Sequence, residues 1–247
     1  MTLERAWLVL GGSSAIARAF ARVAAEAGSD VLLAGRDLED LERTARDIRV
    51  RYGRQAEALA FDATDCASHA AFVDAVRSRA RRLDVFLAFG LMPTQAAIDA
   101  DTDLGLQTIA ATYTGTASVL LRLAPTLEAQ REGWVVVLGS VAGDRGRLKN
   151  YVYGSAKAGL HAFAQGLRAR LFRAGVQVTT VKPGFIDTAM TFGLRPGPLT
   201  ASPEACARAC LRYARRGREV AYYPPVWRLI MLLIRLIPEP LMKRLNF

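Results

Sequence analysis

Three side chains with complementary chemistry, Ser140, Tyr153 and Lys157, lie within one stretch of 18 residues. Tyr153 and Lys157 are four residues apart, so a helix that begins near Tyr151 would place them on one face, one turn apart. The apolar run at residues 134–138 predicts a buried strand, and Ser140 follows directly after it. Because ligands of parallel sheets bind beyond the carboxyl ends of the strands, the three side chains are predicted to meet at a binding site.

These residue types suit the reduction of a ketone by hydride. A phenol can donate a proton to the developing alkoxide, and the unperturbed pKa of tyrosine is about 10. An ammonium one turn away stabilises the phenolate, so we expect Lys157 to lower the pKa of Tyr153 and ease the proton transfer near neutral pH. A serine hydroxyl can hold the carbonyl oxygen in place.

The alternative is an ordinary surface pair, since Tyr-x-x-x-Lys occurs by chance on many helices. The chain uses Arg for 29 of its 33 basic residues, so lysine is the minority choice. Lysine is also the basic residue whose pKa and compact head suit a crowded site. These residues alone leave both readings open.

The N-terminal segment has the pattern of a phosphate-binding turn. Residues 6–10 read as a strand and residues 15–27 as a helix, and the connection Gly11-Gly12-Ser13-Ser14-Ala15 consists of small residues. A helix N-terminus that follows such a loop can hold a phosphate through its free N–H groups. A plain strand-to-helix turn is the alternative, but it would not need five small residues in a row.

The end of the second predicted strand, residues 30–34, bears on the identity of a dinucleotide. Gly35, Arg36 and Asp37 follow it, about 20 residues after the loop, where an adenosine ribose is expected. An acidic residue there would accept from a 2′-hydroxyl, whereas an arginine would bind a 2′-phosphate. Arg36 comes first, and Asp37 can equally cap the next helix, so the sequence favours NADP(H) over NAD(H).

The rest of the chain continues the alternation of strands and helices. The pattern predicts a doubly wound, seven-stranded parallel sheet of the Rossmann type that forms a single domain over residues 1–247. Residues 91–102 are expected to be irregular, and residues of about 185–200 read as a substrate flap. The predicted strands are 6–10, 30–34, 55–61, 84–88, 134–138, 176–181 and 219–223, and the predicted helices are 15–27, 38–51, 67–82, 103–130, one from 151 and one from 203 to about 216.

Taken in order, these motifs resemble the short-chain dehydrogenase/reductase family over nearly the whole chain. The resemblance rests on the glycine loop, Asp62 after the third strand, Ser140 thirteen residues before Tyr153, and the segment Pro183-Gly184-Phe185-Ile186-Asp187-Thr188. It implies NAD(P)-dependent hydride transfer by Ser140, Tyr153 and Lys157, with Asp62 near adenine and Ile186 and Thr188 near the nicotinamide amide. The residues that it implies around the cofactor are Gly11, Ser13, Ser14, Ile16, Arg36, Asp62, Ala63, Ala88, Gly90, Tyr153, Lys157, Pro183, Ile186 and Thr188.

The sequence departs from the family pattern in three places. Two glycines of the family loop are Ala15 and Ala17 here. The family motif Asn-Asn-Ala-Gly after the fourth strand is reduced to Ala88-Phe89-Gly90. Thr112 stands where family members often carry an asparagine that anchors a proton-relay water, so the relay is expected to differ. By contrast, Gly35-Arg36 resembles the members that use NADP.

Within the family, the second half of the chain resembles the decaprenylphosphoryl-2-keto-ribose reductases. The similarity rests on Phe89-Gly90-Leu91, on residues 151–155 and on the ending from Pro224 to Pro238. It implies a 2-keto-pentose on a polyprenyl phosphate as substrate, in place of a free small molecule, and a flavin oxidase as partner. The family also implies a homo-oligomer.

The composition of the chain argues against several other classes of protein. The chain of 247 residues has three Cys and two His, which suit neither a disulfide framework nor a metal site. The net charge of +10 is compatible with anionic partners, but no nucleic-acid-binding signature accompanies it. We find no signal peptide and no apolar run of the roughly 18 residues that a membrane span needs. A cytoplasmic location is therefore expected.

The last apolar segment, residues 227–237 within a predicted amphipathic helix of about 225–237, allows two interpretations. It can pack over the active site or a subunit interface. It can also lie on the inner face of a membrane, with Arg228 and Arg235 at the headgroups. Two rival functions follow from the departures and from this tail. One is a protein that binds a dinucleotide without turnover, and the other is a membrane-peripheral scaffold.

Overall fold

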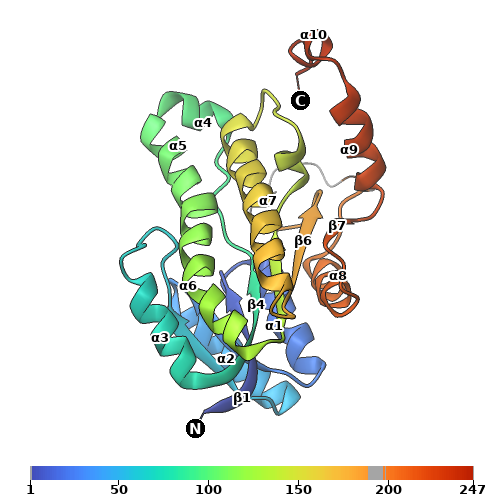
Figure 1. Ribbon diagram of the computed structural model, residues 1–247. Helices are drawn as coiled ribbons and strands as arrows, with labels where there is room; N and C mark the ends of the chain where they lie inside the picture. The colour runs from blue at the N-terminus through green and yellow to red at the C-terminus, as the bar shows by residue number, and fades with distance from the viewer. Residues whose placement is uncertain (1, 189–196, 198, 247) are drawn as a thin grey trace.

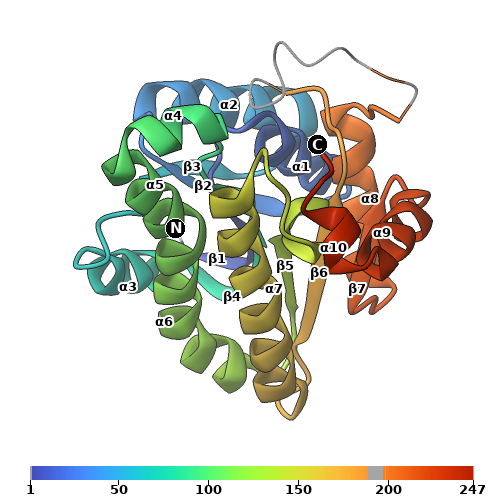
Figure 2. The same ribbon diagram turned by 90° about the horizontal axis from the view of Figure 1, so that it is seen from above.

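Seven parallel strands form one sheet in the order β3-β2-β1-β4-β5-β6-β7 (Figures 1 and 2). The structure is a computed structural model that describes residues 2–188, 197 and 199–246. The predicted doubly wound sheet is confirmed. Its strands are β1 (Leu3–Leu10), β2 (Asp30–Gly35), β3 (Ala56–Ala60), β4 (Ala80–Leu87), β5 (Trp134–Leu138), β6 (Gln177–Pro183) and β7 (Val220–Tyr223).

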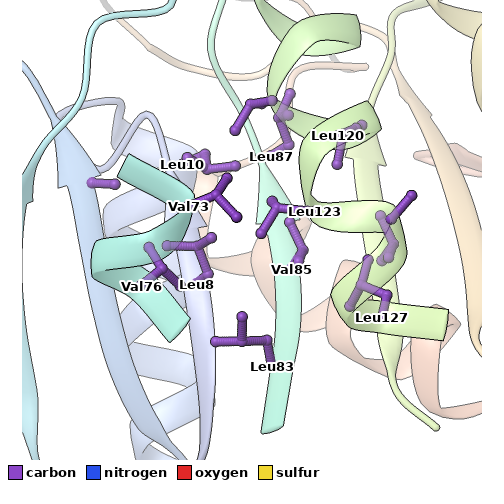
Figure 3. Close-up of a cluster of buried hydrophobic side chains, with 14 of the residues drawn as sticks. Leu8, Leu10, Val73, Val76, Leu83, Val85, Leu87, Leu120, Leu123 and Leu127 are labelled. Carbon is purple, nitrogen blue, oxygen red and sulfur yellow. The ribbon is translucent and has the colours of Figure 1, made fainter. Parts of the chain in front are cut away.

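Helices cover both faces of the sheet, which explains why the central strands are apolar on both sides. On one face, alternate residues of β1 and β4, such as Leu8 and Val85, pack against α3 (His69–Arg79), α6 (Gly115–Gln130) and α7 (Tyr151–Phe172) (Figure 3). On the other face, the intervening residues pack against α1 (Ala15–Glu26), α2 (Leu38–Tyr52) and α8 (Pro203–Arg215). Both layers hold the carboxyl ends of the strands at one edge.

The order of the strands fixes where a ligand can bind. From β1 the chain winds outward through β2 and β3, and it then returns to place β4 on the opposite side of β1 (Figure 2). The connections that follow β1 and β4 therefore leave in opposite directions. Such a switch point is the usual position of a dinucleotide in open α/β sheets.

Two predictions of local structure were wrong. Residues 80–82 belong to β4 and not to a helix, because Leu3 pairs with Ala80 and extends the strand pair beyond what local propensity suggests. The segment 91–102 contains α4 (Gln95–Ala100), which begins at a Thr94 cap. The helical stretch predicted at 103–130 is confirmed: it consists of α5 (Thr102–Ile109), a π-helical turn η1 (Ala110–Thr114) and α6, and Pro125 lies inside α6.

The tail forms α9 (Trp227–Leu236) and α10 (Glu239–Met242). Trp227 and Met231 are buried and pack with Val141, directly after the predicted catalytic Ser140. Most of the predicted flap, residues 189–196 and 198, lies outside the described residues. None of the helices in the described part of the chain is both long and apolar enough to span a membrane.

Candidate active site

The fold brings Ser140, Tyr153 and Lys157 together. Ser140 follows β5 and caps the short 3-10 helix η2 (Val141–Asp144), where its hydroxyl accepts a hydrogen bond from Ala142 N at 3.1 Å. Tyr153 and Lys157 lie one turn apart at the start of α7, and both are buried. The side chains of Ser140 and Tyr153 share a hydrogen bond.

Burial sets the protonation of the pair. It raises the pKa of Tyr153 to about 12, and the hydrogen bond with Ser140 opposes this only in part. Burial also lowers the pKa of Lys157 to about 8. The Lys157 ammonium donates to the Leu138 carbonyl oxygen at 2.8 Å and lies 5.8 Å from the centre of the Tyr153 ring.

The net shift of the Tyr153 pKa is therefore upward, and the lowering contribution expected from Lys157 stays a prediction. Desolvation of the phenolate is the main cause of this upward shift, and the hydrogen bond of the Lys157 ammonium points to a backbone carbonyl. Tyr153 is consequently a fully protonated phenol at neutral pH, with a hydroxyl that has a partner in Ser140.

The small-residue loop after β1 lies at the switch point. Gly11 has φ of +83°, and a Cβ there would lie 2.8 Å from the Ala88 carbonyl oxygen, so the turn requires glycine. Ser14 caps α1 by accepting from Ala17 N at 3.2 Å and donates to Ala88 O at 3.1 Å. These contacts tie the loop to the end of β4. Ser13 is exposed and Ile16 is half-buried beside it.

The two loop alanines occupy different environments. Ala17 is fully buried in the core, where its methyl group packs among apolar side chains. Ala15 is exposed at the first position of α1. Only Ala15 therefore presents its methyl group at the outer surface of the loop, and the N-terminus of the helix keeps its orientation.

The adenosine end predicted from the sequence also comes together. Asp37 caps α2 by accepting from Asp40 N at 3.0 Å, and both Arg36 and Asp37 are exposed after the end of β2. Asp62 accepts from Thr64 N and Thr64 Oγ1, and these hydrogen bonds lower its pKa, with a small contribution from Arg36. Arg36 and Asp62 are thus close enough for their charges to interact.

Two close approaches fix the backbone around this end. A Cβ at Gly115 would lie 1.9 Å from the Ala63 carbonyl oxygen, so α6 begins in direct contact with the segment after β3. At Gly90 a Cβ would lie 3.1 Å from Thr112 Oγ1, which accepts from Leu91 N at 3.2 Å. Thr112 sits in the π-helical turn, a feature that the sequence analysis missed.

The residues predicted near a nicotinamide follow β6. Pro183 ends the strand, Ile186 is buried and bridges to Ala201, and Thr188 is half-buried. Gly184 lies against Trp227, because a Cβ there would meet the indole at 2.0 Å. The tail helix therefore starts directly beside this segment.

The family model for short chain dehydrogenases matches residues 5–198. An uncharacterized oxidoreductase of Streptomyces coelicolor is 39% identical over 245 residues, which cover 98% of this chain and 96% of the relative. Another, from Mycobacterium tuberculosis, is 35% identical over 239 residues, 96% of each chain. The chain belongs to the short-chain dehydrogenase/reductase family.

Solved structures agree with this assignment. A structure described as a short chain dehydrogenase/reductase family protein aligns with a TM-score of 0.79 and 30% identity, over 90% of this chain and 97% of that one. A structure of an actinorhodin polyketide ketoreductase with NADPH aligns with a TM-score of 0.75 and 22% identity, over 87% and 92% of the two chains. Because its identity is low, the similarity to the polyketide ketoreductase shows only that the two proteins share a fold.

This short-chain dehydrogenase/reductase is accordingly an NAD(P)-dependent oxidoreductase. The residues present fit a dinucleotide. The loop and the start of α1 stand at the switch point, and Arg36 offers an exposed cation where the sequence predicts the adenosine ribose. Lys157 has three donor hydrogens, and Leu138 O takes one of them, so ribose hydroxyls are suitable acceptors for the others.

Proposed function

We propose that this enzyme reduces a ketone to a secondary alcohol with NADPH, using Ser140, Tyr153 and Lys157. The observation that carries the proposal is the buried hydrogen bond between Ser140 and Tyr153, one helical turn from a buried ammonium. A protein that only binds a dinucleotide has no need for a desolvated proton donor there. The buried phenol therefore disfavours the non-catalytic alternative.

Each residue has a task that follows from its environment. When bound, the nicotinamide supplies the hydride. Ser140 donates a hydrogen bond to the substrate carbonyl oxygen and orients it towards the phenol. Tyr153, protonated because its pKa is about 12, gives its proton to that oxygen as negative charge develops. Lys157 stabilises the phenolate that remains and binds the nicotinamide ribose.

The direct test is consumption of NADPH with a panel of ketones, followed by identification of the alcohol. The panel includes free 2-keto-pentoses and 2-keto-pentoses linked to a polyprenyl phosphate. Turnover of any of these ketones with an alcohol product supports the proposal. Tight binding of NADPH without turnover of any carbonyl would favour the binding protein.

Selectivity for NADP(H) is proposed to depend on Arg36. Arg36→Leu is expected to weaken binding of NADPH about 10- to 100-fold, since a hydrogen bond to a charged group contributes about 1.5–3 kcal/mol. Binding of NADH should stay within about twofold. Nicotinamide fluorescence titrations measure both. Arg46→Leu is the matched control, because Arg46 is exposed on α2 and pairs with Glu42. Equal losses for the two cofactors would contradict the assignment.

For the substrate, we propose a keto-sugar on a polyprenyl phosphate, made by a flavin oxidase partner. Support comes from the resemblance of Phe89-Gly90-Leu91 and of the ending of the chain to the decaprenylphosphoryl-2-keto-ribose reductases. A lipid-linked substrate would require the enzyme to work at a membrane surface. A homo-oligomer, as expected from the family, is part of the same proposal.

The tail helix supplies a surface for such contact. One face of α9 packs on the protein through Trp227 and Met231. The opposite face carries leucines that recur at i, i+3, i+4 and i+7 and are each more than half exposed: Leu229, Leu232, Leu233 and Leu236. Arg228 and Arg235 are exposed as well, and spacing by seven places them on one flank of that face. An exposed leucine face beside arginines suits an anionic lipid surface.

Substitution of Leu229, Leu233 and Leu236 by Gln is expected to reduce binding to phosphatidylglycerol vesicles more than tenfold. Reduction of a soluble ketone should persist, because these side chains point away from the body of the protein. Vesicle co-sedimentation measures the effect. A matched control replaces three other exposed leucines, Leu106, Leu121 and Leu148. If both triple variants sediment like the unmodified protein, α9 does not bind lipid. If the α9 variant instead changed its oligomeric state, the exposed leucine face would be the interface with a second copy of the chain.

A further inference from the structure

A buried polar cluster lies directly behind Ser140, and the proton-transfer scheme above does not use it. Asp144, at the end of η2, is its centre. The Asp144 carboxylate accepts from Lys182 Nζ at 2.5 Å and from Tyr222 Oη at 2.6 Å. Its side chain is 2% exposed, and His161 of α7 approaches it from the other side. We call these four residues the Asp144 cluster.

His161 links the cluster to the catalytic serine. It follows Lys157 by four residues and Tyr153 by eight, so all three side chains lie on one face of α7. Its Nε2 atom accepts a hydrogen bond from the backbone N–H of Ser140 at 3.3 Å. The contact is made to the backbone of Ser140, while the Ser140 hydroxyl faces Tyr153.

Two glycines make room for the imidazole ring. A Cβ at Gly139 would lie 2.4 Å from His161 Nε2, and a Cβ at Gly143 would lie 2.8 Å from His161 Cε1. The ring therefore lies between the backbone segments on either side of Ser140. Any side chain at these glycines would displace it. The glycines of this loop are thus explained by the histidine that they accommodate.

The hydrogen bonds determine the tautomer of the ring. Because Nε2 accepts from Ser140 N–H, the proton of neutral His161 is on Nδ1, which lies 3.6 Å from Asp144 Oδ1. Burial, and then the charge of Lys182, lower the pKa of His161 to about 3, while Asp144 opposes this in part. The ring is neutral near physiological pH, so Nε2 remains an acceptor.

We propose that His161 is a positioning residue for Ser140, held in the required tautomer by Asp144. The ring accepts the Ser140 N–H and keeps that residue extended, with φ of −168° and ψ of 150°, so that the hydroxyl meets Tyr153. Lys182 and Tyr222 hold the carboxylate in turn. The inference rests on the proposed ketone reduction, because its consequence is the orientation of the substrate carbonyl.

Two polar replacements of His161 distinguish the contact of the ring with Ser140 from its contact with Asp144. His161→Gln places an amide oxygen near the position of Nε2, so the acceptor for Ser140 N–H is kept. His161→Asn is one methylene shorter, so it keeps a polar group towards Asp144 but loses the acceptor. We expect the Asn variant to lower kcat about 5- to 100-fold, the cost of leaving a buried donor unsatisfied. The Gln variant should recover most of that loss, and binding of NADPH should be similar in both.

A double-mutant cycle with Ser140→Ala tests whether His161 affects kcat through Ser140. If His161 acts through Ser140, His161→Asn should change kcat little once the Ser140 hydroxyl is gone. An equal fold-loss in both backgrounds would overturn the proposal, since it would mean that His161 supports the fold or another residue. Equal activity of the His161→Gln and His161→Asn variants would also overturn the proposal.

An NMR measurement separates this inference from the proposed function. The Ser140 amide proton should resonate downfield in the unmodified protein and in His161→Gln, and it should move upfield in His161→Asn. An amide shift that is the same in all three proteins would overturn the positioning role, whatever the activity. If no ketone is reduced while the amide behaves as expected, the contact stands and the proposed reaction fails.

Discussion

Replacement of Tyr153 by Phe is expected to lower kcat about 10³-fold while NADPH binds as before. General acid catalysis by a positioned side chain typically contributes 10²- to 10⁴-fold, and Tyr153 is the buried phenol next to Ser140. The substitution removes one oxygen atom and leaves the ring, so the packing at the start of α7 is kept. Steady-state kinetics give kcat, and nicotinamide fluorescence gives the dissociation constant.

Tyr151 offers a matched control for this substitution. It lies two residues earlier on the same helix, is exposed, and donates a hydrogen bond to Asp99 at 2.6 Å. Tyr151→Phe also deletes one hydroxyl, and we expect kcat within about threefold of the unmodified enzyme because a surface hydrogen bond contributes only about 1 kcal/mol. If Tyr153→Phe behaved like this control, Tyr153 would not be the proton donor.

Replacement of Lys157 by Met should have the second largest effect, a loss of about 10²- to 10³-fold in kcat/KM. The ammonium that we propose to stabilise the phenolate and to bind the nicotinamide ribose is removed, whereas the apolar stem of the side chain is retained. Binding of NADPH should weaken as well, which distinguishes this variant from Tyr153→Phe. Lys149→Met removes an exposed charge from the loop before α7 and serves as the control.

The pKa of Lys157 predicts how activity and stability depend on pH. Its value of about 8 lies below the ordinary 10.5, so the ammonium is present in the folded protein below pH 8 and is lost as the pH rises through 8. The kcat/KM for reduction should therefore fall above pH 8. Between pH 8 and 10.5 the unfolded chain binds more protons at this lysine than the folded chain does. The lysine therefore costs stability near neutral pH, and this cost is relieved as the pH rises across that range.

Lys157→Met should accordingly retain or gain thermal stability while it loses activity. A shift from 10.5 to about 8 corresponds to roughly 3 kcal/mol of unfavourable burial for the ammonium, an order-of-magnitude figure that Met avoids. Thermal unfolding at pH 7 tests this. A variant that is both inactive and much less stable would indicate that Lys157 has mainly a structural role.

The sequence predicted the architecture because its signals are local. Apolar runs mark the strands, and the small residues of the Gly11 loop mark the turn at the switch point. The spacing of Tyr153 and Lys157 places both on one helical face, and Ser140 stands at the end of an apolar strand. Asp37 could be read as a cap from its position before α2, and its hydrogen bond to Asp40 N bears this out.

What the sequence could not supply depends on tertiary contacts. The start of β4 at Ala80 is decided by its pairing with Leu3, against the helical propensity of the local residues. The direction of the pKa change at Tyr153 is decided by burial, which no spacing reveals. His161 could have been noticed four residues after Lys157. Its role requires Asp144 and Lys182, which come from other elements.

The most direct test of the account is transfer of deuterium from NADPH labelled at the reactive C4 position to a ketone found in the panel. Mass spectrometry of the alcohol would follow the label in the unmodified enzyme and in Tyr153→Phe. We expect one deuterium on the carbinol carbon with the unmodified enzyme and only a trace with Tyr153→Phe. Equal transfer by both proteins, or no transfer to any ketone by an enzyme that binds NADPH, would contradict it.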